Sequence, residues 1–192
     1  MVTGASGDIG KKVVAKLKKI NAKSIVCLER EPIYLDKTKE QITEVKYVTG
    51  LNFNEPASVE QKFIEAMKKL GGDLDHLFLC HGILSDKNLT NGQVPDFDNV
   101  MRVNVRSHVH MISLAFPFLK VNQKQHSSIS VLTSAQGEYP DPRNSMMSIG
   151  AAMVKQLVEC TALEGAYYKI RVNAVATGVV ASKAGVQKKN AD

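Results

Sequence analysis

The hydrophobic residues of this chain alternate between two spacings. Short apolar runs recur between longer stretches whose apolar residues repeat every three or four positions. A short run is typical of a strand buried on both faces, whereas the longer spacing is typical of an amphipathic helix. The expected strands span residues 1–3, 24–28, 45–48, 76–80, 128–132 and 170–176.

Helices are expected between several of these strands. The first follows a glycine-rich segment, and the second begins at Glu55-Pro56 and ends at Gly71-Gly72. Their apolar stripes are formed by Val13, Val14, Leu17 and Ile20, and by Val59, Phe63, Met67 and Leu70. Longer helices are expected at residues 97–119 and 148–166.

This alternation of strands and helices is typical of βαβ units, whose strands form a parallel sheet. Six strands and five crossovers can be counted, with no internal repeat and no linker. Residues 1–192 are therefore expected to form a single domain. We predict a three-layered, doubly wound α/β fold with strand order 3-2-1-4-5-6 and right-handed crossovers.

Composition excludes several other classes of protein. Of the 192 residues, 44% are hydrophobic and 23% are charged, which favours one well-buried domain over a disordered, collagenous or coiled-coil chain. The longest apolar stretch, around residues 112–119, is interrupted by Ser113 and Pro117. It is much shorter than the roughly 18 residues of a transmembrane helix, so no membrane span is expected.

The formal net charge is a modest +6. Lysines are densest in and after the first expected helix, without aromatic residues between them: Lys11, Lys12, Lys16, Lys18, Lys19 and Lys23. Such a cluster is either a solvated helix face or a surface for an anionic partner. We favour the solvated face and expect no nucleic-acid partner.

Cysteine and histidine usage gives no metal signature. Cys27, Cys80 and Cys160 lie in apolar surroundings without metal-ligand spacing, and a sparse, odd number of thiols is typical of a reducing compartment. We therefore expect an intracellular protein of undetermined organelle, and see no signal peptide at residue 1. His108 and His110 are two residues apart in an expected helix and point to different faces.

The segment between the first strand and the first helix reads Thr3-Gly4-Ala5-Ser6-Gly7-Asp8-Ile9-Gly10. In doubly wound sheets a ligand lies at the carboxyl ends of the strands. Glycines let the backbone turn tightly and approach a pyrophosphate, whose charge is stabilised at a helix N-terminus. The segment therefore predicts a dinucleotide pocket of the Rossmann type. The alternative is that the glycines only form a turn.

An acidic residue follows at a typical distance. Glu29 ends the second strand nineteen residues past Gly10, where an acid commonly binds the hydroxyl groups of the adenosine ribose. If a cofactor binds, Glu29 predicts a preference for NAD(H) over NADP(H), which Arg30 beside it weakens. The alternative is a solvated strand end with no ligand.

Together these residues resemble the short-chain dehydrogenase/reductase family. Residues 3–10 are similar to its glycine motif TGxxxGxG, although the spacing TGxxGxxG found here is closer to the family's extended branch. Arg171-Val172-Asn173-Ala174-Val175 resembles the family's sixth strand. Gly178 matches the glycine of the PG motif that follows it, and Thr177 replaces the proline. The resemblance spans essentially the whole chain.

The resemblance implies a set of cofactor-binding residues. Asn52 stands where the family has an Asp that contacts adenine, and Gly82 is retained from its NNAG motif, here Leu79-Cys80-His81-Gly82. The implied set is Gly4, Ser6, Gly7, Asp8, Ile9, Gly10, Glu29, Asn52 and Gly82. NAD is the cofactor that these residues suggest, and whether it is bound is left open.

The family's catalytic Tyr and Lys are both missing. In many members the Tyr lies thirteen residues beyond the catalytic Ser, which Ser134 matches, and the Lys follows four residues later on the same helix face. The Tyr transfers a proton and the Lys lowers its pKa. Met147 and Ala151 occupy these positions, and residues 140–166 contain no Tyr. The resemblance is therefore to a degenerate member that lacks the YxxxK pair.

Two other residues of the family's active site remain. Asn104 matches the active-site Asn, and Ser134 the Ser. We interpret both as remnants that cap a helix, complete a buried hydrogen bond or are simply inherited, and expect no functional catalytic residue. His81 could titrate near neutrality and is the alternative acid/base.

The ends of the chain leave two interpretations open. Only Met1 and Val2 precede Thr3, and the chain ends at Asp192 after the polar run 183–192, where the family continues with a helix, a substrate-covering segment and a seventh strand. The sequence is either a window on a longer protein or a shortened family member. In the second case the sixth strand is a sheet edge whose unpaired backbone groups need covering.

The leading functional hypothesis is a non-catalytic family homologue that acts as a structural or assembly subunit of a larger complex, with or without a retained nucleotide. It implies protein partners. The alternative is an NAD(P)-dependent oxidoreductase with an atypical active site. A third hypothesis is a dinucleotide-sensing module that binds its ligand without turnover.

Overall fold

The computed structural model describes residues 1–32, 43–121 and 127–181. The strands in these ranges are β1 (Val2–Thr3), β2 (Ser24–Leu28), β3 (Glu44–Val48), β4 (His76–Leu79), β5 (Ser128–Ser134) and β6 (Arg171–Thr177). The α-helices are α1 (Asp8–Lys19), α2 (Pro56–Leu70), α3 (Val94–Met101), α4 (Ser107–Val121) and α5 (Ser145–Ala166). The π-helix η1 (Arg102–Arg106) and the 3₁₀-helix η2 (Ala135–Gly137) complete them.

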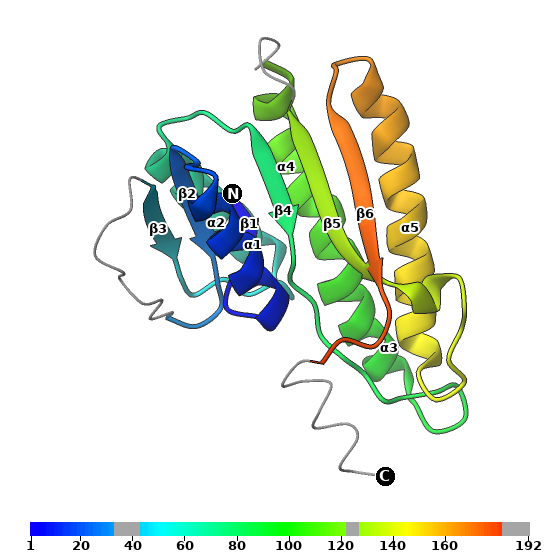
Figure 1. Ribbon diagram of the computed structural model, residues 1–192. Helices are drawn as coiled ribbons and strands as arrows, with labels where there is room; N and C mark the ends of the chain where they lie inside the picture. Colours follow the sequence, from blue (N-terminus) through cyan, green and yellow to red (C-terminus); the bar gives the residue numbers. More distant parts are fainter. Residues whose placement is uncertain (33–42, 122–126, 182–192) are drawn as a thin grey trace.

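All six of these strands lie in one sheet in the order β3-β2-β1-β4-β5-β6, and each neighbouring pair is parallel (Figure 1). β1 is central, with Thr3 opposite Leu28 of β2 and Leu79 of β4. The predicted strand order and doubly wound α/β fold are therefore confirmed. Because every strand runs in the same direction, the carboxyl ends of all six meet at one edge of the sheet.

The hydrophobic core lies on both faces of the sheet. Side chains alternate along β2, so that Val26 and Leu28 pack in the large cluster formed with α2, α4 and α5. Ile25 and Cys27 pack on the opposite side against Val14 of α1. This two-sided burial explains why β2 appears in the sequence as an uninterrupted apolar run.

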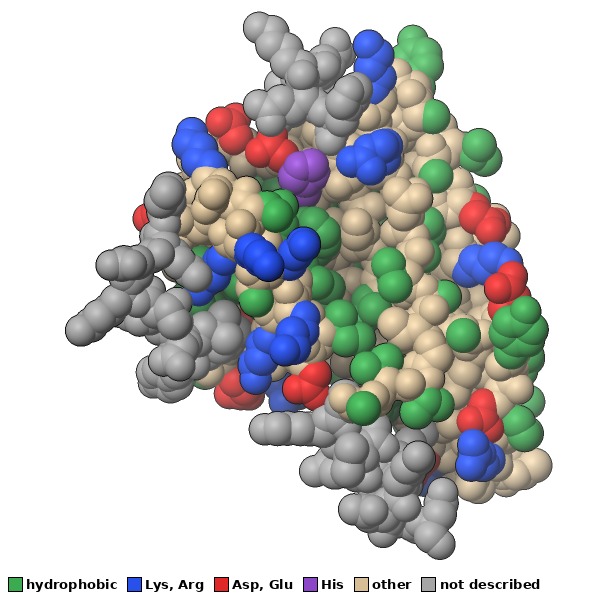
Figure 2. Space-filling view, in the orientation of Figure 1, with side chains coloured by type: hydrophobic (Ala, Val, Ile, Leu, Met, Phe, Trp, Pro, Cys, Tyr) green, Lys and Arg blue, Asp and Glu red, His purple; other side chains and the backbone are tan. Residues whose placement is uncertain are grey.

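Helix α1 covers only part of the sheet face on which it packs. Over β4, β5 and β6, no helix of the described chain lies on this side of the sheet (Figure 1). Figure 2 views this face: Lys and Arg side chains gather over α1, and hydrophobic side chains are visible beside them. Val175 of β6 is 58% exposed. The lysines of α1 that are exposed are compatible with both interpretations of the lysine cluster, a solvated helix face and a surface for an anionic partner.

The helix predicted at 97–119 is longer and less regular than its apolar pattern indicates. It extends from Val94 to Val121 through η1, a π-helical turn. It begins early because Pro95 occupies the first turn, where the backbone N–H of Gln93 donates to the Asp96 carboxylate at 2.9 Å. The π-helical turn contains Asn104, and such turns are frequent at functional sites.

No helix in the described ranges has the length and apolarity needed to span a membrane. In the same ranges, no three His, Cys, Asp or Glu side chains are arranged to hold a metal ion. The polar run at residues 183–192 lies outside the described residues.

We expect Gly10→Ala to destabilise the fold. A Cβ at this position would lie only 2.0 Å from the Gly4 carbonyl oxygen, so α1 would have to move away from the loop. Overpacking of this kind typically costs about 1–3 kcal/mol, measured as the free energy of unfolding in urea. Gly178→Ala is the control, because a Cβ there meets no atom within 4 Å. Equal stabilities of the two variants would contradict the close approach.

Candidate functional site

The predicted site residues gather at the carboxyl edge of the sheet. The glycine loop follows β1, Glu29 follows β2, His81 and Gly82 follow β4, and Ser134 ends β5. The parallel topology alone brings these segments, far apart in the sequence, to one edge. Asn104 of η1 and Met147 of α5 join them through side-chain contacts.

The glycine loop turns tightly between β1 and α1. Gly4 has a φ of +64°, and its backbone lies so close to β4 that a Cβ would be 2.7 Å from the His81 nitrogen. The N–H of Gly7 donates to the Gly4 carbonyl at 3.1 Å. Gly7 is the N-cap of α1, and no side chain caps this helix. The first turn of α1 therefore presents its N–H groups without a side-chain partner at the N-cap.

This loop has a shape that fits a phosphate group. Ser6, Gly7 and Asp8 are exposed, and Ile9 is half-buried, so the loop is accessible at the helix N-terminus that favours an anion. The charges are mixed, because the Asp8 carboxylate opposes an anion whereas Lys11 and Lys12 are exposed in the following residues. The backbone geometry of the loop therefore suits the phosphates of a dinucleotide, whereas the mixed side-chain charges around it favour an anion only in part.

Glu29 is turned toward the glycine loop. Its side chain accepts two hydrogen bonds from Ser6, one from the backbone N–H to Oε1 and one from the hydroxyl to Oε2, both 2.8 Å long. The residue is only 4% exposed. Burial raises the pKa of the carboxyl, and the bonds from Ser6 oppose this shift. This contact with Ser6 was not foreseen from the sequence, and the predicted contact of Glu29 with ribose hydroxyl groups stays a prediction.

Asn52 organises the turn before α2. Its Oδ1 accepts from the Asn54 N–H at 3.0 Å, and its Nδ2 donates to the Glu55 carboxylate at 2.7 Å. Its own backbone N–H donates to the Ser58 hydroxyl at 3.0 Å. The adenine contact implied by the family resemblance stays a prediction.

His81 forms the centre of a buried stack of three rings. Its ring lies 3.7 Å from that of Phe53 and 4.2 Å from that of His108, measured between centroids. Its Nδ1 is 2.6 Å from the Thr3 hydroxyl, and its Nε2 is 2.6 Å from the Ser107 hydroxyl. Because Ser107 donates its own proton to the Val103 carbonyl, the neutral Nε2–H tautomer satisfies both contacts.

These contacts give His81 a structural role. It is 7% exposed, and burial, together with the neighbouring His108, lowers its pKa well below the ordinary value. Both ring nitrogens are engaged by hydroxyl groups of β1 and α4. The alternative of His81 as the acid/base would require both contacts to break.

His108 is even more buried, at 2% exposure. Neither ring nitrogen has a hydrogen-bond partner of good geometry in the described part of the chain. Burial lowers its pKa to about 4, an effect that the nearby Asn104 backbone opposes in part. Its place in the stack was not predicted from the sequence, in which it was considered only as a metal ligand.

Asn104 connects the segment after β4 to α5. Its Oδ1 accepts from the Ile83 N–H at 2.8 Å, and its Nδ2 donates to the Ile83 carbonyl at 2.9 Å. The same Nδ2 lies 3.4 Å from the Met147 sulfur, which accepts weakly. Met147 is half-buried and Ala151, one turn later, is 7% exposed. The helix face at these two positions is apolar.

Ser134 caps a helix, as one of its interpretations predicted. Its hydroxyl accepts from the backbone N–H of Gln136 at 3.2 Å, at the N-cap of η2. Gly137, the last residue of η2, packs closely against α5: a Cβ at this position would lie 2.8 Å from the backbone of Ala151. This contact holds α5 against the end of β5.

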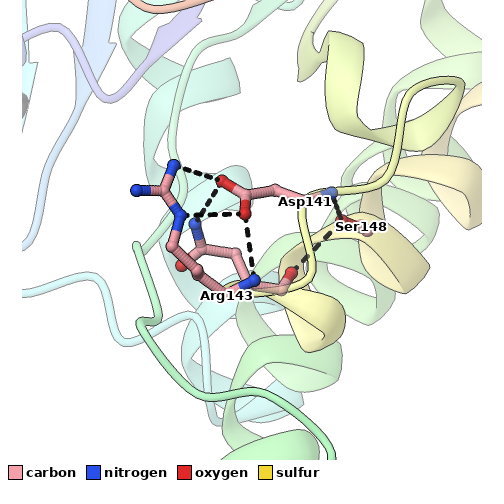
Figure 3. Close-up of polar contacts among 4 residues, drawn as sticks. Asp141, Arg143 and Ser148 are labelled. Atoms are coloured by element: carbon pink, nitrogen blue, oxygen red, sulfur yellow. Dashed lines mark hydrogen bonds and ion pairs between the residues drawn. The ribbon is translucent and has the colours of Figure 1, made fainter.

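A polar cluster that was not predicted from the sequence lies at the start of α5 (Figure 3). The Asp141 carboxylate accepts from the backbone N–H, Nε and Nη2 of Arg143 and from Nδ2 of Asn144. Ser148 donates to the Asn144 carbonyl and accepts from the Asp141 N–H, both at 3.2 Å. The hydrogen bonds from Arg143 lower the pKa of Asp141 to about 2.

This cluster explains why α5 begins at Ser145 rather than at the predicted residue 148. It fixes the first turn of the helix, and therefore the position of Met147. The signal was present in the Asp-Pro-Arg-Asn sequence of residues 141–144, since Asp and Asn commonly bond to nearby backbone N–H groups in turns before helices.

The parallel sheet and its glycine loop define a Rossmann-type domain of the NAD(P)-binding class. Residues 1–192 match the short chain dehydrogenase family. The chain belongs to this family.

Two curated relatives illustrate the similarity. An uncharacterized oxidoreductase of Thermotoga maritima is 28% identical over 187 residues, which cover 95% of this chain and 72% of the relative. A tropinone reductase homolog of Datura stramonium is 27% identical over 183 residues, covering 94% of this chain and 67% of the relative.

Solved structures share the fold. A short chain dehydrogenase family protein from Francisella tularensis has a TM-score of 0.84 at 23% identity, covering 99% of this chain and 74% of that one. The 3-ketoacyl-(acyl-carrier-protein) reductase of Brucella melitensis complexed with NADH has a TM-score of 0.81 at 22% identity, covering 96% of this chain and 77% of that one.

We expect the buried histidines to make stability depend on pH. Because the pKa of His108 is lowered from 6.5 to about 4, the unfolded chain binds a proton more readily in this interval. The stabilisation is complete above pH 6.5 and is lost as the pH falls toward 4, by about 3 kcal/mol. His81 acts in the same direction.

His108→Phe keeps a ring in the stack but cannot take up a proton, so stability should fall less steeply between pH 6.5 and 4. Urea unfolding across this interval measures the slope. His110→Gln, a change at the half-exposed histidine of the same helix, is the control and should retain the wild-type slope. Identical slopes for wild type and His108→Phe would contradict this origin.

Proposed function

We propose that this chain is a non-catalytic member of the short chain dehydrogenase family that serves as a structural or assembly subunit, with or without a bound nucleotide. The observation that carries the proposal is the apolar helix face of Met147 and Ala151, at the two positions that match the family's Tyr and Lys. A thioether has no proton to transfer, and a methyl group carries no charge to lower a neighbour's pKa.

Among the residues that the structure describes, the side chains around this face do not supply a substitute proton donor. His81 is buried with both ring nitrogens engaged. The hydroxyl of Ser134 caps η2, and the amide of Asn104 bonds to Ile83 and Met147. Tyr139 is 77% exposed and precedes α5. This arrangement supports the loss of the family's general acid/base.

A role in assembly is supported by the edge strand β6. Within the described residues β6 pairs only with β5, and five of its seven residues are exposed: Arg171, Asn173, Ala174, Val175 and Ala176. An exposed edge presents unpaired N–H and C=O groups that another segment can pair with. We propose that a protein partner covers this edge and the uncovered face beside it.

Retention of a nucleotide is supported by the glycine loop. The accessible N-terminus of α1 and the close approach of Gly4 to β4 suit the pyrophosphate of NAD, which the loop residues Gly4 to Gly10 and Gly82 would hold. When bound, such a cofactor supplies hydride chemistry. On this chain's side, the apolar α5 face offers no acid to complete the transfer.

An intracellular, reducing location is proposed from the thiols. All three cysteines are free, and burial raises the pKa of Cys27 to about 12 and that of Cys80 to about 11. These two thiols behave as small hydrophobic side chains, whereas Cys160, expected in apolar surroundings, is exposed.

The alternative is an NAD(P)-dependent oxidoreductase with an atypical active site. The names of the relatives favour it, since they include an oxidoreductase and a reductase homolog. This alternative requires a proton donor from a segment or partner other than the side chains described above.

We expect the purified chain to oxidise NADH no faster than the background rate with a panel of aldehydes and ketones. A general acid/base contributes about 10²–10⁴-fold to such a rate, and the α5 face lacks one. Absorbance of NADH measures the rate, and calorimetry measures binding separately. Turnover at rates typical of the family would refute the proposal. Binding without turnover would leave the sensing and structural roles, which the next experiment separates.

We expect the chain to associate through β6. Val175→Lys places a charge on the exposed edge strand and should lower the mass of the assembly measured by light scattering. Met147→Tyr combined with Ala151→Lys changes a face of helix α5 instead of the edge strand and should leave the mass unchanged. A wild-type chain that is monomeric and catalytically competent would contradict the assembly role.

A further inference from the structure

We propose that Glu29 is a positioning residue: its buried carboxylate holds the glycine loop in shape through Ser6, and does not serve as the acceptor for ribose hydroxyl groups. The inference rests on the proposed nucleotide site only for its consequence in binding. The clamp itself is a property of the free protein.

The two hydrogen bonds of this clamp come from a single loop residue. Ser6 donates its backbone N–H to Oε1 and its hydroxyl to Oε2, each over 2.8 Å. Charge-assisted bonds of this length are about twice as strong as neutral ones. Because each carboxylate oxygen of Glu29 accepts one of these bonds, the pair fixes both the orientation of Ser6 and its distance from Glu29.

The backbone of Glu29 is itself held in place by two hydrogen bonds. The backbone N–H of Glu29 donates to the Val48 carbonyl at 2.9 Å, and its carbonyl accepts from the Leu51 N–H at 3.0 Å. On the loop side, Ala5 is completely buried and Gly7 begins α1. The side chain of Glu29 therefore connects the ends of β2 and β3 to the loop at the point where α1 starts.

Burial separates this arrangement from that of a ribose acceptor. With 4% of its surface exposed, Glu29 presents almost no carboxylate to a ligand that approaches from solvent. The side chains that do face solvent here are Arg30 and Glu31, 77% and 74% exposed and 3.4 Å apart. A ligand at the loop would meet the backbone of residues 6–8, whose shape Glu29 maintains.

The length of the side chain provides the test. Glu29→Asp keeps the charge but is one methylene too short to hold Ser6, whereas Glu29→Gln keeps the length and one acceptor oxygen. Hydrogen exchange of the free protein reports on the Ser6 N–H, whose acceptor in the structure is Glu29. Loss of that acceptor should speed its exchange by about tenfold or more.

We expect fast Ser6 exchange in Glu29→Asp and Glu29→Ala and partial rescue in Glu29→Gln. Glu31→Gln, a change at the exposed neighbour, is the matched control and should exchange as the wild type does. Unchanged Ser6 exchange in both Glu29→Asp and Glu29→Ala would overturn the clamp.

Calorimetric titration with NADH gives a second, independent ranking. The clamp predicts that Glu29→Gln retains NADH affinity better than Glu29→Asp, because loop shape matters more than charge. A direct ribose acceptor predicts the reverse order, and that order would overturn the proposal. If the wild-type chain binds no NADH, nucleotide retention is refuted, and the exchange rates of the free protein decide on the clamp alone.

Discussion

The carboxyl edge of the sheet depends on one close backbone contact. Gly4 leaves β1 with a positive φ and lies against the backbone of Cys80 and His81, and Gly10 of α1 packs against the Gly4 carbonyl. A Cβ at either glycine would push these segments apart. The contact therefore fixes the start of α1 relative to the end of β4 and determines where Ser6 and His81 lie.

His81 extends this contact to the other side of the sheet. It is bonded to Thr3 of β1 and Ser107 of α4 and stacked on Phe53 from the turn before α2. A neutral, buried imidazole pairs with the hydroxyl groups of Thr3 and Ser107 at once, an arrangement that a small apolar side chain cannot provide. The departure from the family's NNAG motif at this position thus coincides with a buried bridge between β1, α4 and the turn before α2.

The fold could be predicted from the sequence because its signals are local and repeated. The uninterrupted apolar run of β2 predicted a buried strand, and both faces of β2 are covered in the structure. The apolar spacing of α2 and the glycine after it predicted a helix and its end, and Gly71 does end the helix with a φ of +75°. The π-helical turn at η1, which contains Asn104, could not be read from the apolar spacing, which predicted one regular helix. The Glu29–Ser6 and His81–His108 contacts could not be predicted because each joins residues that are distant in the sequence, and only the folded sheet brings them together.

Residues 147 and 151, which match the positions of the family's catalytic pair, lie among contacts that involve no catalytic chemistry. The amide of Asn104 reaches α5, where it meets the Met147 sulfur at 3.4 Å, a weak acceptor. The Asp141 cluster still fixes the first turn of α5, and Gly137 still packs against Ala151. None of these contacts requires a proton donor at residue 147 or a cation at residue 151. The supporting interactions therefore do not depend on the residue types at these two positions, so the helix can keep its place in the non-catalytic role that we propose.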